Sequence, residues 1–119
     1  MSPLPNDFDV AVFEGRTLQD VHTTSNTAFF GFGAVEGLEV TTWGEVLIGT
    51  SPVDLRSARV PFPVAEILPF RGQRVRRAQV VGRSSIRITF DASGILEFVE
   101  DTDQYECYEI RMPTRHIVI

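Results

Sequence analysis

Charged side chains in the second half of the chain are segregated by sign. Between Phe70 and Phe90 there are six arginines and no acid, whereas Asp91 to Ile110 carries seven acids and no base. The simplest interpretation is that neighbouring strands place Arg opposite Glu on their solvent faces, where each exposed pair contributes little. The alternative is an acidic edge that selects a basic partner protein by electrostatic complementarity. The acids that would form this partner-binding edge are Glu97, Glu100, Asp101, Asp103, Glu106 and Glu109.

The arginines offer a second kind of interaction. Arginine recognises phosphate groups, so the Arg-rich strands could bind a nucleic acid or a small anionic ligand. The side chains involved would be Arg71, Arg74, Arg76, Arg77, Arg83 and Arg87. A net charge of −5 argues against broad affinity for nucleic acids and makes this the less favoured alternative. Phe62, which lies between two prolines, fits a core poorly and could be an exposed anchor for a partner.

Residue types that usually carry catalysis are present without the spacing that catalysis requires. His22 and His116 each fall inside an expected strand and lack the spacing of a zinc site. Cys107 has the acids Glu106 and Glu109 nearby, which disfavour a reactive thiolate, so we expect a small core side chain. We therefore expect no catalytic residue, no metal and no cofactor.

A glycine-rich segment superficially resembles a dinucleotide-binding loop. It runs from Gly31 to Gly37, but its glycine spacing differs by one residue and no helical pattern follows. We expect a hairpin loop there.

Composition is that of an ordinary globular protein. At 119 residues, with 43% hydrophobic and 23% charged residues, we expect one domain over 1–119. No apolar run approaches the roughly 20 residues of a membrane span, and the N-terminus does not read as a secretion signal. One cysteine fits a reducing compartment, so we expect a cytoplasmic protein.

The elements that must position these side chains are short strands. About nine are expected, with turns every six to ten residues, which predicts an all-β fold, an antiparallel β-sandwich or a partly closed barrel. Residues 1–9 should form a loose arm, and Val10 to Phe13 can start the first strand. The expected strands are Thr17 to Thr23, Thr27 to Phe32, Leu38 to Trp43, Glu45 to Ile48, Arg74 to Val81, Ser85 to Phe90, Leu96 to Phe98, Tyr105 to Arg111 and Arg115 to Ile119.

Similar patterns in the two halves indicate an internal repeat of β-meander units. Unit one covers 10–49, a connector covers 50–69 and unit two covers 70–119. The hairpin of unit one should place Phe32 opposite Leu38 and Phe30 opposite Val40. The same scheme in unit two places Phe90 opposite Leu96 and Ile88 opposite Phe98. In the connector, Pro63 to Leu68 could form a short helical turn ended by Pro69, and an uncovered edge strand would make a homodimer plausible.

One stretch of the second unit resembles other proteins. A glycine followed by Leu96-Glu-Phe98, an acidic spacer, Tyr105 to Ile110 and a closing Ile117-Val-Ile119 is similar to a group of small bacterial proteins of unknown function. In size and acidity the chain also resembles immunity proteins, which bacteria encode beside secreted toxins. This resemblance implies a non-enzymatic protein that covers the active site of a cognate toxin. Contact residues do not transfer, because immunity interfaces differ from pair to pair.

Overall fold

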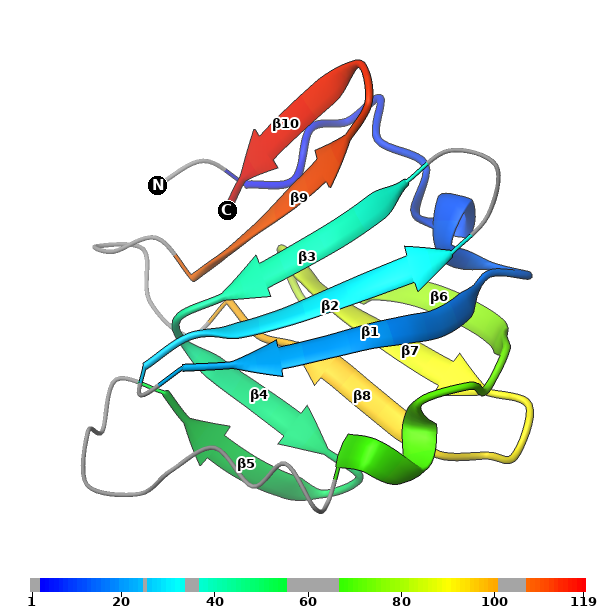
Figure 1. Cartoon of the computed structure of the whole chain (residues 1–119). Helices are drawn as coiled ribbons and strands as arrows, with labels where there is room; N and C mark the ends of the chain where they lie inside the picture. The colour runs from blue at the N-terminus through cyan, green and yellow to red at the C-terminus, as the bar shows by residue number, and fades with distance from the viewer. Residues whose placement is uncertain (1–2, 25, 34–36, 56–66, 101–106) are drawn as a thin grey trace.

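Two five-stranded antiparallel sheets pack face to face in the computed structural model, which describes residues 3–24, 26–33, 37–55, 67–100 and 107–119. In Figure 1 sheet A lies in front of sheet B. Sheet A has the order β1 (Thr17–Thr23), β2 (Ala28–Gly33), β3 (Leu38–Thr42), β9 (Tyr108–Met112) and β10 (Arg115–Val118). Sheet B has the order β5 (Ser51–Asp54), β4 (Glu45–Ile48), β8 (Ile95–Phe98), β7 (Ser85–Phe90) and β6 (Val75–Val81). The expected all-β fold is confirmed, and it is a sandwich rather than a closed barrel.

Each half of the chain contributes to both sheets. The first half gives the meander β1–β2–β3 to sheet A and the hairpin β4–β5 to sheet B. The second half gives the meander β6–β7–β8 to sheet B and the hairpin β9–β10 to sheet A. Pairing of β3 with β9 and of β4 with β8 joins the halves, so neither sheet is complete without both.

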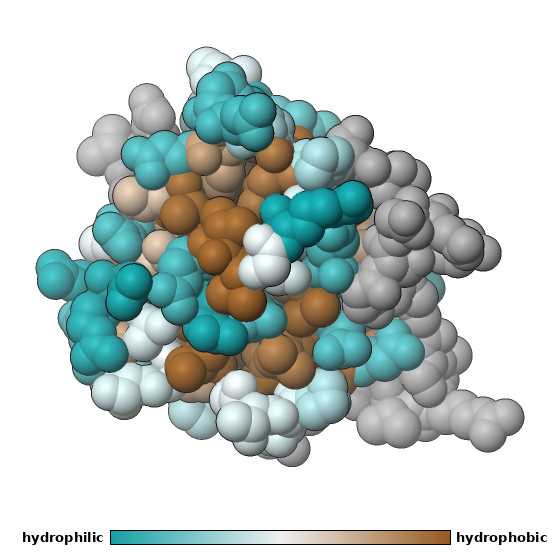
Figure 2. Space-filling model, turned by 180° about the vertical axis from the view of Figure 1, so that it is seen from behind, coloured by the Kyte–Doolittle hydropathy of each residue, from teal (hydrophilic) through white to brown (hydrophobic). Residues whose placement is uncertain are grey.

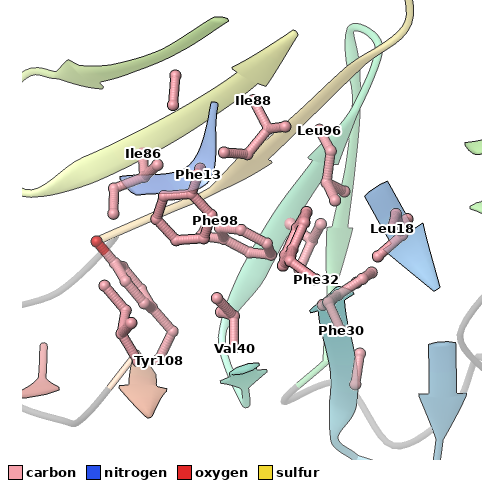
Figure 3. Packing of buried hydrophobic residues seen from close by; sticks show 14 of the residues in the cluster. Phe13, Leu18, Phe30, Phe32, Val40, Ile86, Ile88, Leu96, Phe98 and Tyr108 are labelled. Carbon is pink, nitrogen blue, oxygen red and sulfur yellow. The ribbon is translucent and has the colours of Figure 1, made fainter. Parts of the chain in front are cut away.

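The core lies between the sheets because alternate residues of each strand face inward. Burial along β3 alternates without interruption, as expected for a strand with one face on a core. Phe98 of β8 is fully buried, and its ring centroid lies 5.3 Å from that of Phe30 and 6.0 Å from that of Tyr108 (Figure 3). Burying one side chain of this size contributes about 1.5–3 kcal/mol. Cys107 is buried among these residues, as expected.

Strand register agrees with the sequence-based expectation in one hairpin and differs in the other. In β2–β3, Phe32 lies opposite Leu38 and Phe30 opposite Val40, as predicted. In β7–β8 the predicted pairing of Phe90 with Leu96 and of Ile88 with Phe98 is wrong. Leu96 lies opposite Ile88 there, and Phe98 lies opposite Ile86.

A tight turn explains why the register of β7 against β8 differs by two residues from the prediction. The amide of Ser93 donates to the carbonyl of Phe90 at 2.8 Å, and the amide of Phe90 donates to the carbonyl of Gly94 at 2.9 Å. Ser93 has a φ of 71°, a left-handed conformation that closes the turn early. Because the side-chain period of a strand is two, the shifted register leaves the same side chains facing the core.

Two local expectations for the first half of the chain are corrected. Val10–Phe13 is a 3-10 helix (η1) rather than the start of a strand, and the carboxylate of Asp9 accepts a hydrogen bond from the amide of Ala11 at 3.0 Å. There are ten strands among the described residues, because β5 forms inside the expected connector. Its Pro52 is tolerated because β5 is an edge strand, where a missing amide costs no ladder bond.

The expected helical turn at Pro63 to Leu68 falls mostly outside the described residues. The described part is a 3-10 turn, η2 (Leu68–Phe70), in which Pro69 is the second residue rather than the end of the turn. No helix among the described ranges is long and apolar enough to cross a membrane.

The N-terminal arm is held rather than loose from Leu4 onward. The amide of Leu4 donates to the hydroxyl of Ser84 at 2.8 Å, and the guanidinium of Arg115 lies 2.7 Å from the carboxylate of Asp7. Hydrogen bonding and charge from Arg115 lower the pKa of Asp7. Leu4 and Phe8 also pack against the core, so the arm covers an edge of the sandwich.

Candidate interaction surface

The oppositely charged side chains of the second unit largely pair with one another. In β7 and β8, Arg87 lies opposite Glu97, and its Nε is 2.9 Å from the Glu97 carboxylate. Arg83 contacts the two carboxylate oxygens of Glu100 at 3.2 and 3.1 Å. Glu97 is only 6% exposed, so its carboxylate faces Arg87 rather than solvent. The simplest interpretation of the segregated charges therefore applies to these two pairs.

The other arginines divide into bound and unbound groups. Arg74 forms an ion pair of 3.2 Å with Asp91, and Nε of Arg71 donates to the carbonyl of Gln19 at 3.0 Å. Arg76 and Arg77 lie at the irregular start of β6, are exposed, and make no ion pair with any residue the structure describes. Of the six arginines, Arg76 and Arg77 are the adjacent two without an ion-pair partner among the described residues, so both guanidinium groups are available for an anion.

The remaining acids of the predicted edge do not form one surface with Glu97 and Glu100. Glu109 lies on β9 in sheet A, where its carboxylate is 2.6 Å from Nε2 of His116 and 3.7 Å from Arg111. Asp101, Asp103, Glu106 and the proposed anchor Phe62 lie outside the described residues.

A row of polar positions crosses the outer face of sheet A. Strand register places Asp20 opposite Gly31, Gly31 opposite Glu39, Glu39 opposite Arg111, and Arg111 opposite His116. These residues face away from the core, because their strand neighbours such as Val40 are the buried ones. One line of five residues, here called the cross-strand row, thus spans all five strands of sheet A on the face toward the viewer in Figure 1.

Three shallow, open hollows follow the cross-strand row. The first, of about 150 Å³, is lined by Asp20, Gly31 and Glu39 among others. The second, of about 310 Å³, lies between Glu39 and Arg111, and the third, of about 400 Å³, lies between Arg111 and His116. Neighbouring hollows share lining residues, and the three together are here called the depression.

Glycines in β2 make room for this depression. A Cβ added to Gly33 would lie 2.1–2.3 Å from the side chain of Gln19, which extends over it. A Cβ on Gly31 would lie 3.2 Å from Cβ of Asp20 and 3.6 Å from the ring of Phe29. Side chains of β1 therefore lean across β2, and a larger residue at position 31 or 33 would displace them.

Charge is distributed unevenly along the cross-strand row. Arg111 and His116, at the β9–β10 end, are both contacted by the carboxylate of Glu109. At the β1–β3 end, Asp20 and Glu39 make no ion pair with a described residue. The depression consequently has an end whose two carboxylates make no ion pair with a described residue, here called uncompensated, and an end at which one carboxylate contacts both basic side chains.

The outer face of sheet B is different in character. Seen from behind in Figure 2, its centre is hydrophobic and is bordered by polar side chains. Leu47 and Ile95 are half-buried on this face, and Val80 of the edge strand β6 is 45% exposed. The uncompensated carboxylates of the cross-strand row thus lie on the opposite side of the sandwich from this apolar surface.

Sequence reasoning did not single out Asp20 or Arg111, and Gly31 entered only as part of an expected hairpin loop. The available signal was the alternation of Gly31 and Gly33 with large inward side chains such as Phe32, which marks a strand that places no side chain of its own on the outer face at these two positions. Pairing of β3 with β9 joins residues about seventy positions apart, which sequence spacing does not reveal. Within the described ranges no three His, Cys, Asp or Glu side chains are grouped as a metal site would need.

Comparison of the chain with protein-family models, with curated protein sequences and with solved structures gave no significant match.

Proposed function

We propose that this chain is a non-enzymatic protein-binding module, an immunity-type inhibitor that binds and blocks a cognate bacterial toxin through the outer face of sheet A. The observation that carries the proposal is the uncompensated pair of carboxylates, Asp20 and Glu39, in a depression that crosses the sheet. Small-molecule sites are usually concave enough to bury most of their ligand, whereas these hollows are shallow and open. Such a surface suits a protein partner.

Electrostatics indicate a basic partner. The chain has a net charge of −5, and long-range attraction would speed its encounter with a positively charged protein surface. Of the acids first considered for this role, Glu109 belongs to the proposed face, while Glu97 and Glu100 are occupied by Arg87 and Arg83. A cytoplasmic location, which the single cysteine suits, would let the protein neutralise its partner where both are made.

Two assays test the proposal, one for binding to the toxin candidate and one for protection of cells against it. The protein should co-purify with the product of the neighbouring reading frame, and its expression should rescue cells from the toxicity of that product. The variant Asp20→Asn with Glu39→Gln should rescue less well than the control Asp54→Asn with Asp91→Asn, which removes two exposed acids outside sheet A. Absence of both binding and rescue would contradict the proposal.

One observation supports a second function, the binding of an anionic ligand or nucleic acid. Arg76 and Arg77 are adjacent, exposed and without an ion-pair partner among the described residues. Binding of single-stranded or duplex oligonucleotides should then depend on salt and be lost in Arg76→Glu with Arg77→Glu. The carboxylate partners of Arg74, Arg83 and Arg87 weigh against this alternative.

A further inference from the structure

We infer that the partner inserts an arginine side chain into the hollow at the β1–β3 end of the cross-strand row, where its guanidinium lies above Gly31 between Asp20 and Glu39. The inference rests on the proposed function and names the group of the partner that this face recognises. It follows from the charge of this hollow, from an aromatic ring beside Gly31 and from the spacing of the strands that carry the two acids.

Charge determines which end of the row accepts a cation. At the other end Arg111 is already present, and the Glu109 carboxylate contacts both Arg111 and His116, so a second cation there would meet a like charge without a free acid. Asp20 and Glu39 make no ion pair with a described residue, although Arg111 lies opposite Glu39, and both acids line the first hollow. Within the depression, the β1–β3 end is therefore the complementary position for a basic side chain.

An aromatic ring beside Gly31 favours arginine over lysine. Cε1 of Phe29 lies 3.6 Å from the Cβ position of Gly31, and Oδ2 of Asp20 lies 3.3 Å from the same point. A guanidinium is planar, stacks on aromatic faces and donates up to five hydrogen bonds in a fixed fork. It can contact the Phe29 ring and the Asp20 carboxylate together, which a compact ammonium group does less well.

The width of the hollow also fits one side chain. Asp20 and Glu39 lie on either side of β2, so their Cα atoms are roughly 10 Å apart, or two strand spacings. A guanidinium in this span can make charge-assisted hydrogen bonds of about 2.8 Å with the carboxylates. Because residue 31 is glycine, no side chain of β2 rises between the two acids at this position, and the Asp20 side chain leans over the backbone instead.

A divalent metal ion fits the hollow less well than a guanidinium. Calcium takes six to eight oxygen ligands at 2.3–2.6 Å, and two carboxylates on strands separated by a third strand do not converge in that way. No third acid from the described residues lines this hollow. A guanidinium needs only one or two acceptors on each side, which the hollow has.

A titration with a probe peptide tests the inference without the natural partner. Capped tri-arginine is added to the ¹⁵N-labelled protein, with capped tri-lysine and uncharged tri-citrulline as matched probes. Amide shifts should centre on Asp20, Gly31 and Glu39 and exceed those at the exposed acids Asp54 and Asp91. Tri-lysine should bind several-fold more weakly, and tri-citrulline should produce no localised shifts.

Two variants make the test specific. Asp20→Asn with Glu39→Gln removes the charge at nearly constant shape and should abolish the localised shifts. Gly31→Ala keeps the charge, places a methyl group in the hollow and should weaken tri-arginine binding several-fold. The control Asp54→Asn with Asp91→Asn should leave the titration unchanged, and an unaltered spectrum elsewhere verifies that each variant is folded.

The outcomes separate this inference from the function on which it rests. Tri-arginine shifts spread evenly over all exposed acids, or shifts unaffected by Asp20→Asn with Glu39→Gln, would overturn the inference even if a toxin partner binds. Shifts centred on Gly31 with arginine selectivity would support the inference. If the neighbouring gene product then failed to bind, that result would contradict only the proposal that the partner is this toxin.

Discussion

Replacing Tyr108 by phenylalanine should destabilise the fold measurably. Tyr108 is fully buried on β9, and its hydroxyl donates to the carbonyl of Ser84 in the turn between β6 and β7, so this bond joins sheet A to sheet B. Its loss leaves a buried acceptor without a partner and should cost about 1–2 kcal/mol. An unfolding entropy of about 2.1 cal/mol/K per residue gives about 0.25 kcal/mol/K for 119 residues. The melting temperature should therefore fall by about 4–8 °C.

The same residue predicts how stability depends on alkaline pH. Burial, with a smaller contribution from the charge of Glu100, raises the pKa of Tyr108 far above its usual range. In the unfolded chain a tyrosine loses its proton near pH 10, so the native state binds more protons than the unfolded state above that value. The resulting contribution to stability is complete below about pH 10 and is lost as pH rises further. Tyr108→Phe removes this group, so the difference in stability between the two proteins should narrow above pH 10.

Thermal and urea unfolding, followed by far-ultraviolet circular dichroism from pH 7 to 11.5, measures both effects. Thr114→Val is a suitable control, because Thr114 is exposed in the β9–β10 turn and its replacement should change the stability by less than about 0.5 kcal/mol. Equal melting temperatures for the wild type and Tyr108→Phe, with parallel alkaline profiles, would show that the hydroxyl is solvated. That result would refute the packing of sheet A against the β6–β7 turn.

Two further substitutions test the packing of sheet B. Arg87→Met should destabilise by about 1–3 kcal/mol, because the carboxylate of Glu97 stays buried without its cation, and the double variant with Glu97→Met should recover part of that loss in a double-mutant cycle. Additive effects of the two changes would argue that the pair does not interact. Gly94→Ala should cost about 1–3 kcal/mol in urea unfolding, because the new Cβ would lie 2.2 Å from the ring of Phe70, which stacks on Phe90 at 5.1 Å. Unchanged stability would mean that the Phe70 ring has room to move.

Local alternation in the sequence was enough to predict most of the strands and the faces they bury. Phe30 and Phe32 alternate with glycines, and the short loop after them fixes the register of β2 against β3. The predicted register of β7 against β8 differs by two residues from the observed one. The prediction placed a five-residue loop around Gly94, whereas Ser93, in a left-handed conformation, closes a tighter turn. Strand β5 was missed because Pro52 is usually a mark of irregular structure, and only its place at the sheet edge makes it acceptable.

The candidate surface was harder to foresee, for a physical reason. Charge segregation along the chain pointed to the strands of sheet B, yet cross-strand pairing such as Arg87 with Glu97 neutralises many of those charges. Nothing in the sequence around Asp20 and Glu39 marks them as binding residues. They lie near each other only because β1 and β3 pair with the two sides of β2, where both face Gly31. Long-range pairing of β3 with β9, which brings Arg111 beside Glu39, follows from the packing of the whole sandwich rather than from local pattern.

Calorimetric titration of the toxin candidate into three forms of the protein tests the central claim most directly. The wild type and the control Asp54→Asn with Asp91→Asn should bind with similar affinity. Asp20→Asn with Glu39→Gln should bind at least tenfold more weakly, which corresponds to about 1.4 kcal/mol, and should lose part of the salt dependence. Equal affinity for all three forms, or an equal loss in the control, would contradict the assignment of the binding surface to the outer face of sheet A.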